Sequence, residues 1–170
     1  MKILDATTSI KGMWYQPDND YTVFMDQRYE DIRMKKGISN GYILLRIHPD
    51  IIAKWAHLPF KNNSFDMIVF DPPHIIRNEG IKNGSITLKY GILHHQSWRE
   101  VLRSAFVELF RVLRPEGTLI LKWAESDINK DEVLKLAAYT PMFGSVTGNK
   151  NNTNWICFIK YPKLNTTIGE

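Results

Sequence analysis

The sequence predicts an α/β protein with a doubly wound, mostly parallel sheet that ends in an antiparallel C-terminal hairpin strand. Short apolar segments alternate with candidate helices through most of the chain, which is typical of sheets built from strand-helix-strand units. Two of these segments end in a carboxylate, Asp26 and Asp71. The last two apolar segments, residues 143–147 and 154–161, flank a tip rich in Gly and Asn and break the alternation. Because ligands bind at the carboxyl ends of strands in such sheets, we expect the functional site beside the two acids.

The composition favours a single domain. The chain has 170 residues, of which 44% are hydrophobic, and we expect one domain over residues 1–162 followed by a C-terminal tail, residues 163–170. The net charge of +4 and the pI near 9.1 fit a polyanionic partner, and they equally fit a protein without one. Cys157 lies in an apolar segment and predicts a buried thiol, and a single cysteine excludes an internal disulfide. No apolar run reaches the ~20 residues of a membrane span and the N-terminus lacks a signal-peptide pattern, so we expect a cytoplasmic protein with no membrane partner.

The first third of the chain predicts three strands. Residues 2–4 form a short apolar strand that leads into small polar residues, and residues 21–25 form the second strand. The connection between them leaves room for only one or two helical turns. Residues 27–40 are charged and show a weak helical pattern at Ile32 and Met34, and residues 42–47 are the candidate third strand.

The next segment predicts the centre of the sheet and of the site. Residues 67–70 are continuously apolar, as in a strand buried on both faces, and Asp71 stands at its carboxyl end. Pro72 and Pro73 fix φ and supply no N–H, so we expect a rigid loop whose carbonyl groups accept hydrogen bonds beside the Asp71 carboxylate. Residues 75–95 contain glycine and no clear period, which indicates an irregular loop that covers the site. The basic residues of this loop either bind phosphate or serve solubility: Arg77, Lys82 and Lys89.

The remaining chain contains the clearest helix. Ser97 and Glu100 match a capping box, apolar residues recur at helical spacing over positions 101–113, and Pro-Glu-Gly at 115–117 ends the helix. Residues 118–123 predict a strand and residues 131–138 a further helix. The neighbouring His94 and His95 have no carboxylate or third histidine at ligand spacing, so we expect a solvated pair and no metal site.

Three features occur in one order: a loop beginning with Asp5 after the first strand, Asp26 after the second, and Asp71-Pro72-Pro73-His74 after the central strand. With the C-terminal hairpin, this order resembles the class I S-adenosylmethionine-dependent methyltransferases, which have a Rossmann-like sheet. Within them it resembles the amino-methyltransferases whose signature is Asp or Asn, Pro, Pro, aromatic. More narrowly, it is similar to short phage and prophage methyltransferase-like proteins with His in the last place and a helix that ends Phe-Arg-Val-Leu-Arg-Pro-Glu-Gly, here residues 110–117. The similarity covers residues 3–160.

The resemblance implies methyl transfer to an exocyclic amine, with adenine N6 in DNA as the favoured substrate and RNA or a small molecule as near variants. Asp71 and the Pro72 carbonyl would accept the two N–H hydrogens and turn the nitrogen lone pair toward the sulfonium methyl. His74, after Pro73, would stack on a base extruded from the duplex. As further substrate contacts we expect Arg77 and Lys89 from the basic loop and Lys122 and Trp123 from the end of the next strand, where the alternative for the tryptophan is packing at the rim of the core.

The resemblance also implies S-adenosylmethionine as cofactor. The loop of Asp5 and the small residues after it would surround the methionine moiety. Asp26 would accept the ribose hydroxyls, and His57-Leu58 would hold the adenine edge. The implied cofactor residues are Asp5, Ala6, Thr7, Thr8, Asp26, His57 and Leu58. The sequence departs from the family at residues 8–11, where glycine is usual, and at Lys54-Trp55, where the phage relatives carry an acid and an aromatic residue.

Two function classes therefore stay open. The intact Asp71-Pro72-Pro73 favours an active methyltransferase, whereas the altered loop at residues 8–11 favours a weak or inactive subunit that lends nucleic acid contacts to another chain. Within these 170 residues we expect no recognition element beyond the loop of residues 75–95 and the tip of the C-terminal hairpin. Specificity would then be loose, carried by loops, or supplied by a protein partner or a second copy, and the nucleic acid partner is expected to be DNA in preference to RNA.

Overall fold

The computed structural model describes residues 1–35, 41–78, 84–144 and 153–161. The predicted tail and Lys82 lie outside these residues. Eleven strands and three helices are formed, in the order β1 (Ile3–Asp5), β2 (Thr22–Asp26), β3 (Glu30–Lys35), β4 (Tyr42–Ile47), β5 (Ile51–Ile52), β6 (Phe65–Phe70), β7 (Ile76–Arg77), α1 (Ser85–Tyr90), β8 (Leu93–His94), α2 (Trp98–Val112), β9 (Leu113–Ala124), α3 (Lys130–Leu134), β10 (Phe143–Gly144) and β11 (Thr153–Ile159) in the described part.

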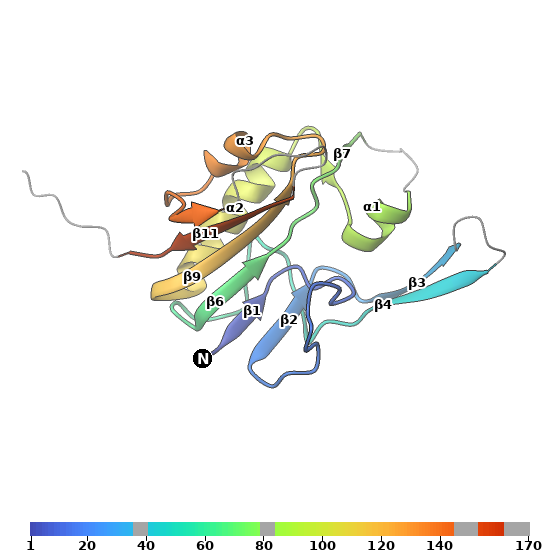
Figure 1. Ribbon diagram of the computed structural model, residues 1–170, viewed down its shortest axis with the longest axis horizontal. Coiled ribbons are helices and arrows are strands. Elements are labelled where there is room, and N and C mark those ends of the chain that lie inside the picture. Colours follow the sequence, from blue (N-terminus) through green and yellow to red (C-terminus); the bar gives the residue numbers. More distant parts are fainter. Residues whose placement is uncertain (36–40, 79–83, 145–152, 162–170) are drawn as a thin grey trace, which may run out of the picture.

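The main sheet confirms the predicted fold class. Its seven strands follow the order β10-β11-β9-β6-β1-β2-β5. The pairs β1–β2, β1–β6, β6–β9 and β2–β5 are parallel, and β11 is antiparallel to both β9 and β10 (Figure 1). The order reverses direction at β1 and β6, so the carboxyl ends of β1, β2 and β6 flank the point where ligands bind in open α/β sheets.

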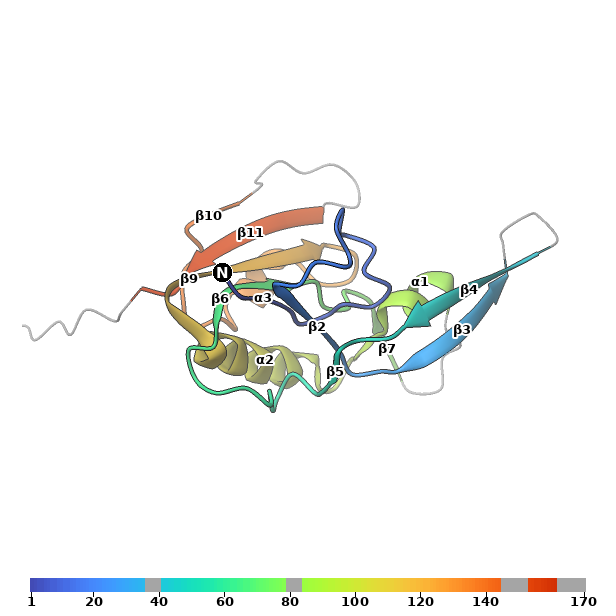
Figure 2. The same cartoon turned by 90° about the horizontal axis from the view of Figure 1, so that it is seen from below.

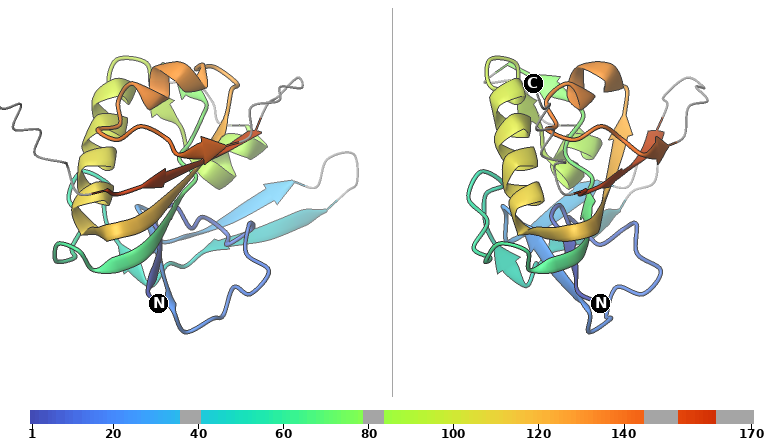
Figure 3. Two further views of the ribbon diagram at one scale, coloured as in Figure 1. Left: turned by 60° about the vertical axis from the view of Figure 1, so that its left-hand side comes forward. Right: turned by 90° about the vertical axis from the view of Figure 1, so that its left-hand side faces the viewer.

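The helices α2 and α3 lie against the same face of this sheet (Figure 3). The residues of α2 that face the sheet are buried and include Leu102, Phe106 and Leu109, and the ring of Phe110 packs 4.3 Å from that of Tyr139, which follows α3. The connection from β1 to β2 runs toward the other edge of the sheet, so a right-handed crossover places it on the opposite face. It forms turns and no helix, in keeping with the short connection expected from the sequence. Among the described helices, none has the length and apolar character needed to cross a membrane.

The expectation for residues 27–47 was wrong in two respects. Residues 42–47 do form a strand, but it pairs antiparallel with β3 as a separate two-stranded hairpin instead of joining the main sheet. The third parallel strand is the two-residue β5. Ile32 and Met34, taken as a helical pattern, are alternate residues of β3 whose side chains point to one face of the hairpin. The hairpin extends from the body beside α1 (Figures 1 and 2).

The second half also differs from the sequence-based expectation. The segment 75–95 contains β7, α1 and β8 among its described residues, so it is not an irregular loop. Ser97 precedes α2 but its side chain makes no capping hydrogen bond, and the Glu100 side chain accepts hydrogen bonds from Arg103 and Ser104. The Pro-Glu-Gly sequence at 115–117 lies inside β9 and does not end the helix, which stops at Val112. The helix expected over residues 131–138 is shorter, at Lys130–Leu134.

Candidate active site

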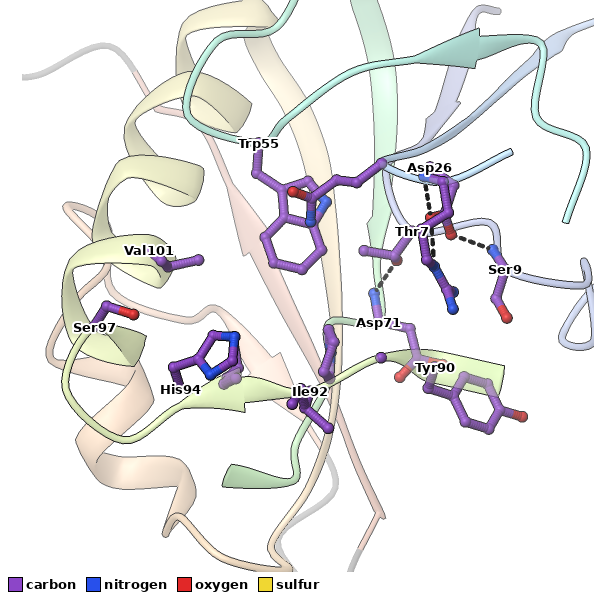
Figure 4. Close-up of a pocket in the computed structure, with 15 residues that line it drawn as sticks. Thr7, Ser9, Asp26, Trp55, Asp71, Tyr90, Ile92, His94, Ser97 and Val101 are labelled. Atoms are coloured by element: carbon purple, nitrogen blue, oxygen red, sulfur yellow. Dashed lines mark hydrogen bonds and ion pairs between the residues drawn. The ribbon is translucent and has the colours of Figure 1, made fainter. Parts of the chain in front are cut away.

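The three acids singled out by the sequence gather at the carboxyl ends of neighbouring strands. Asp5 ends β1, Asp26 ends β2, and Asp71 follows β6. The loop after β1 joins them: the backbone N–H of Asp71 donates to Thr7 Oγ1 at 2.7 Å, and the N–H of Ser9 donates to Asp26 Oδ2 at 2.9 Å (Figure 4). One loop therefore fixes the relative positions of the two acids.

Asp5 is fully buried beneath this loop. Its carboxylate accepts the Thr7 N–H at 3.0 Å and the Trp14 indole N–H at 2.7 Å. Burial raises the pKa of Asp5 to about 6, because the hydrogen bonds from Thr7 and Trp14 offset only part of the cost of removing the charge from water. Asp5 thus holds the loop and places a titratable group behind it.

The loop reaches its conformation without glycine. Ser9 and Lys11 adopt φ values of 48° and 56°, in the left-handed region that usually favours glycine. The Ser9 side chain is buried and its hydroxyl donates to the Lys89 carbonyl of α1 at 2.7 Å. The departure from the family at residues 8–11 therefore gives the loop a side-chain contact with the segment that covers it.

Arg28 makes a second connection to α1. Its guanidinium donates to the carbonyl oxygens of Leu88 and Lys89 at 3.0 and 2.8 Å, and its Nε to Asp26 Oδ1 at 3.2 Å. The last turn of α1 is thereby tied to the acid at the end of β2. Gly91, with φ of 80°, then turns the chain away beside Pro73. These contacts fix the position of Tyr90, the last residue of α1.

Three cavities meet at Asp71 and Tyr90. The first, about 360 Å³, extends over Asp26 and the Trp55 ring (Figure 4), and the second, about 450 Å³, extends over Trp14 and Lys122. The third is about 110 Å³ and is lined by Asp71, Pro72, His74, Tyr90, Lys122, Ala124 and Thr153. The two larger cavities fall within the ~300–1,000 Å³ range of small-molecule and cofactor sites.

The Asp71 carboxylate is paired with Lys122 from β9. Asp71 Oδ2 accepts a hydrogen bond from Lys122 Nζ at 2.6 Å, and the two side chains are 10% and 25% exposed. Burial raises the pKa of Asp71, and the hydrogen bond and charge of Lys122 oppose this rise. Burial lowers the pKa of His74, which keeps the imidazole neutral near pH 7. The site thus combines a carboxylate that accepts hydrogen bonds with a neutral ring.

The structure brings together most of the predicted site residues. Asp71 and its loop, Thr7, Thr8, Asp26 and Lys122 line the three cavities. Ala6 is buried behind the loop, where its carbonyl accepts the Trp55 indole N–H at 3.0 Å. Lys89 contributes its backbone carbonyl to the contact with Arg28.

Other predicted residues lie apart. The Leu58 N–H donates to Glu108 at 2.8 Å and His57 is exposed, and neither lines the three cavities. Trp123 points into the core, where its indole N–H donates to the Ile128 carbonyl. Arg77 pairs with Asp127 at 3.1 Å in a separate cavity.

Several residues of the site have no role in the sequence-based prediction, among them Trp55, Tyr90 and Arg28. Trp55 and Tyr90 line the cavities and Arg28 ties Asp26 to α1. The departure at Lys54-Trp55 marked the first of them, and the position of Arg28, two residues after a strand-end acid, was a weak signal for the third. Tyr90 lies in a segment without periodicity, which gave no signal. Within the described residues no group of His, Cys, Asp or Glu is arranged to hold a metal ion.

Comparison with known proteins identifies the fold. No protein family model matches the chain, and no curated protein matches its sequence. A solved structure from Pyrococcus horikoshii is 14% identical with a TM-score of 0.58, covering 94% of this chain and 81% of the other. The Burkholderia thailandensis 1,6-didemethyltoxoflavin-N1-methyltransferase, solved with its substrate and S-adenosylhomocysteine, is 13% identical with a TM-score of 0.52, covering 94% and 71%. A S-adenosylmethionine-dependent methyltransferase from Aquifex aeolicus is 12% identical with a TM-score of 0.50, covering 94% and 82%. The chain has the Rossmann-like fold of the class I methyltransferases.

Proposed function

We propose that this protein transfers a methyl group from S-adenosylmethionine to an exocyclic amine, with adenine N6 in DNA as the favoured acceptor. The observation that carries the proposal is the place of Asp71. Its carboxylate stands on the rigid Asp-Pro-Pro-His loop where a cavity lined by Asp26 and Trp55 meets the cavities lined by Lys122 and His74. A donor and an acceptor of the methyl group can therefore approach the same carboxylate from two sides.

The residues present fit the cofactor. In the first cavity a carboxylate suited to ribose hydroxyls, Asp26, lies in the same lining as an aromatic ring suited to an adenine, Trp55. Asp26 already accepts hydrogen bonds from Ser9 and Arg28, but a carboxylate offers about four acceptor positions, so it retains capacity for hydroxyl donors. When bound, S-adenosylmethionine supplies an electrophilic methyl group on a sulfonium. Thr7 lines both larger cavities and would lie along the path between the nucleoside and the methionine moiety.

Asp71 and Pro72 would orient the acceptor amine. The amine lone pair is delocalised into its ring, and two acceptors that bind both N–H hydrogens turn this lone pair toward the methyl carbon. Lys122 binds Asp71 Oδ2, which leaves Oδ1 for the first N–H and the Pro72 carbonyl for the second. With the methyl group supplied by bound S-adenosylmethionine, positive charge would develop on the amine nitrogen beside a carboxylate that burial has made more basic. Asp71 can then accept the proton that the methylated nitrogen loses.

The signature loop favours an amine, and the net charge of +4 suits a nucleic acid. The Burkholderia thailandensis protein is a 1,6-didemethyltoxoflavin-N1-methyltransferase, so a free small-molecule amine is the near alternative.

A binding subunit without activity is the second candidate. Lys122 occupies one oxygen of Asp71, and Ser9 and Arg28 already occupy both oxygens of Asp26. If these internal contacts persist in the presence of ligands, they would compete with both the amine and the ribose. This closed arrangement favours a degenerate site.

Calorimetry and labelled-methyl transfer separate the two candidates. We expect S-adenosylmethionine to bind the wild type, Asp26→Ala to weaken that binding, and Asp127→Ala, which removes an acid outside the site, to leave it unchanged. Methyl transfer should be tested in parallel on single-stranded DNA, duplex DNA, RNA and free heterocyclic amines. Asp71→Ala should lower transfer by at least about 10²-fold with little change in cofactor affinity. Absence of binding at millimolar cofactor would reject the enzyme, and full activity of Asp71→Ala would reject the role of Asp71 in methyl transfer.

A further inference from the structure

The hairpin of β3 and β4 has two chemically different faces. Cross-strand partners share a face, and successive residues alternate between faces. One face carries Ile32 with Leu45 and Met34 with Ile43. The opposite face carries Arg33 with Leu44, Lys35 with Tyr42, and Asp31 with Arg46, and every one of these six residues is exposed.

The exposed face continues beyond the strands. Tyr29 and His48 flank β3 and β4, and their rings stack with centroids 4.5 Å apart. His48 Nε2 lies 2.8 Å from Asp31 Oδ1, which places this ring pair on the same face as Asp31. We call this set the basic-aromatic face: Tyr29, Asp31, Arg33, Lys35, Tyr42, Leu44, Arg46 and His48.

The charges of this face are available to a partner. Asp31, its acid, is engaged by His48, whereas Arg33, Lys35 and Arg46 form no ion pair with any described residue. The Arg33 guanidinium lies 4.0 Å from the centroid of the Tyr42 ring, and Tyr42 is still 52% exposed. A monomer gains little from holding three unpaired cations beside exposed aromatic rings, but the combination matches a polyanion with flat, stackable groups.

The hairpin also lies close enough to the site to guide a bound strand toward it. Its first strand begins at Glu30, shortly after Asp26, and Arg28 ties its base to α1, which carries Tyr90 over the site. Each six-residue strand spans about 20 Å, long enough to follow several nucleotides of an extended strand. Figures 1 and 2 show β3 and β4 projecting on the side of α1.

We propose that the basic-aromatic face binds a single-stranded nucleic acid, with Arg33, Lys35 and Arg46 on its phosphates and Tyr42 stacked on a base. The inference rests on the proposed function in naming the substrate class that would be led to Asp71. Unpaired bases suit the face better than a duplex, because the bases of a duplex are stacked on each other and leave the Tyr42 ring without a partner.

Binding to a fluorescent 20-nucleotide DNA strand, measured by anisotropy across a salt series without cofactor, tests this directly. The triple variant Arg33→Gln, Lys35→Gln, Arg46→Gln should lower the slope of log affinity against log salt by about 2, since each phosphate contact on a single strand contributes about 0.7. The matched control removes three exposed cations elsewhere, Lys61→Gln, Arg103→Gln and Lys135→Gln, and should keep the wild-type slope. Equal losses in both variants would overturn the assignment.

An abasic strand of the same length isolates stacking. Wild type should bind the normal strand about 5- to 150-fold more tightly than the abasic strand, Tyr42→Ala should lose this preference, and Tyr42→Phe should retain it. Equal affinity of wild type for the two strands, or tighter binding of a duplex that Tyr42→Ala leaves unchanged, would refute base stacking.

The assay needs no methyl transfer, so an inactive protein that binds through this face rejects only the proposed function. An active enzyme whose triple variant binds nucleic acid as well as wild type rejects only the role of the face.

Discussion

Replacing Lys122 by Met should move the titration of Asp71 upward. Lys122 Nζ lies 2.6 Å from Asp71 Oδ2 and both side chains are largely buried. Burial raises the pKa of Asp71, and Lys122 counteracts this rise. A hydrogen bond to a charged group contributes about 1.5–3 kcal/mol. Because 1.36 kcal/mol corresponds to one pH unit, Asp71 should titrate about one to two pH units higher in Lys122→Met than in the wild type.

The interaction between Asp71 and Lys122 should also contribute to the free energy of unfolding. The pKa of Asp71 in the folded state lies above its ordinary value. Between the unfolded-state and folded-state pKa, the folded protein therefore binds more protons than the unfolded chain, and stability falls as pH rises through this window. Lys122→Met extends the window upward. At pH 8 the variant should therefore lose about 1.5–3 kcal/mol of unfolding free energy, and the loss should shrink as the pH approaches 4.

Carbon-detected NMR of the aspartate carboxyl groups measures the titration, and urea unfolding at pH 4 and 8 measures the stability. Lys61→Met, at an exposed lysine away from the site, is the control for loss of one positive charge. If the enzyme is active, the acid limb of its pH profile should move with Asp71, since a protonated Asp71 is a weaker acceptor for the amine hydrogen and cannot take up the proton that the methylated nitrogen loses. An unchanged Asp71 titration in Lys122→Met, or an equal shift in Lys61→Met, would refute the coupling.

Three further changes test other parts of the structure. The pKa of Asp5 is raised by burial from 3.8 to about 6, so stability should fall by roughly 3 kcal/mol as pH rises from 4 to 7, and Asp5→Asn should abolish this dependence in urea unfolding. Tyr90→Ala should raise KM for the amine substrate, whereas Tyr90→Phe should preserve it; equal effects would mean that the ring does not contact the substrate. A Cβ at Gly117 would lie 2.7 Å from Leu113 Cδ1 and 2.9 Å from the Arg114 carbonyl oxygen, so Gly117→Ala should cost about 1–3 kcal/mol in the same assay, and Gly12→Ala, with 3.5 Å to its nearest neighbour, should cost much less.

Burial explains which elements the sequence predicted. β6 and the inner part of β9 are apolar over several consecutive residues because helices or strands cover them, and α2 carries a regular apolar stripe because one side of it meets the sheet. β5 has only two residues, too few for any period to show. In β3 only Ile32 and Met34 are apolar, and two residues do not distinguish a strand from a helix.

The site was predictable where a residue follows a buried strand, as Asp26 and Asp71 do. Trp55 and Arg28 owe their positions to contacts with residues 49 and 61 positions away, Ala6 and Lys89, and local sequence carries no trace of such contacts. A local pattern can also mislead: Glu100 matches a capping box in the sequence, but its side chain accepts hydrogen bonds from Arg103 and Ser104. The roles of individual residues in binding and catalysis stay predictions.

The two sides of the site differ in how much regular secondary structure supports them. On the side of Lys122, the site rests on β6 and β9, which are long strands packed on α2. On the side of Asp26, the sheet ends in the two-residue β5 and the first crossover has no helix. Side-chain contacts to α1 from Ser9 and Arg28 take the place of that missing structure. Since α1 also carries Tyr90, the contacts from Ser9 and Arg28 also hold in place the segment that lies over Asp71.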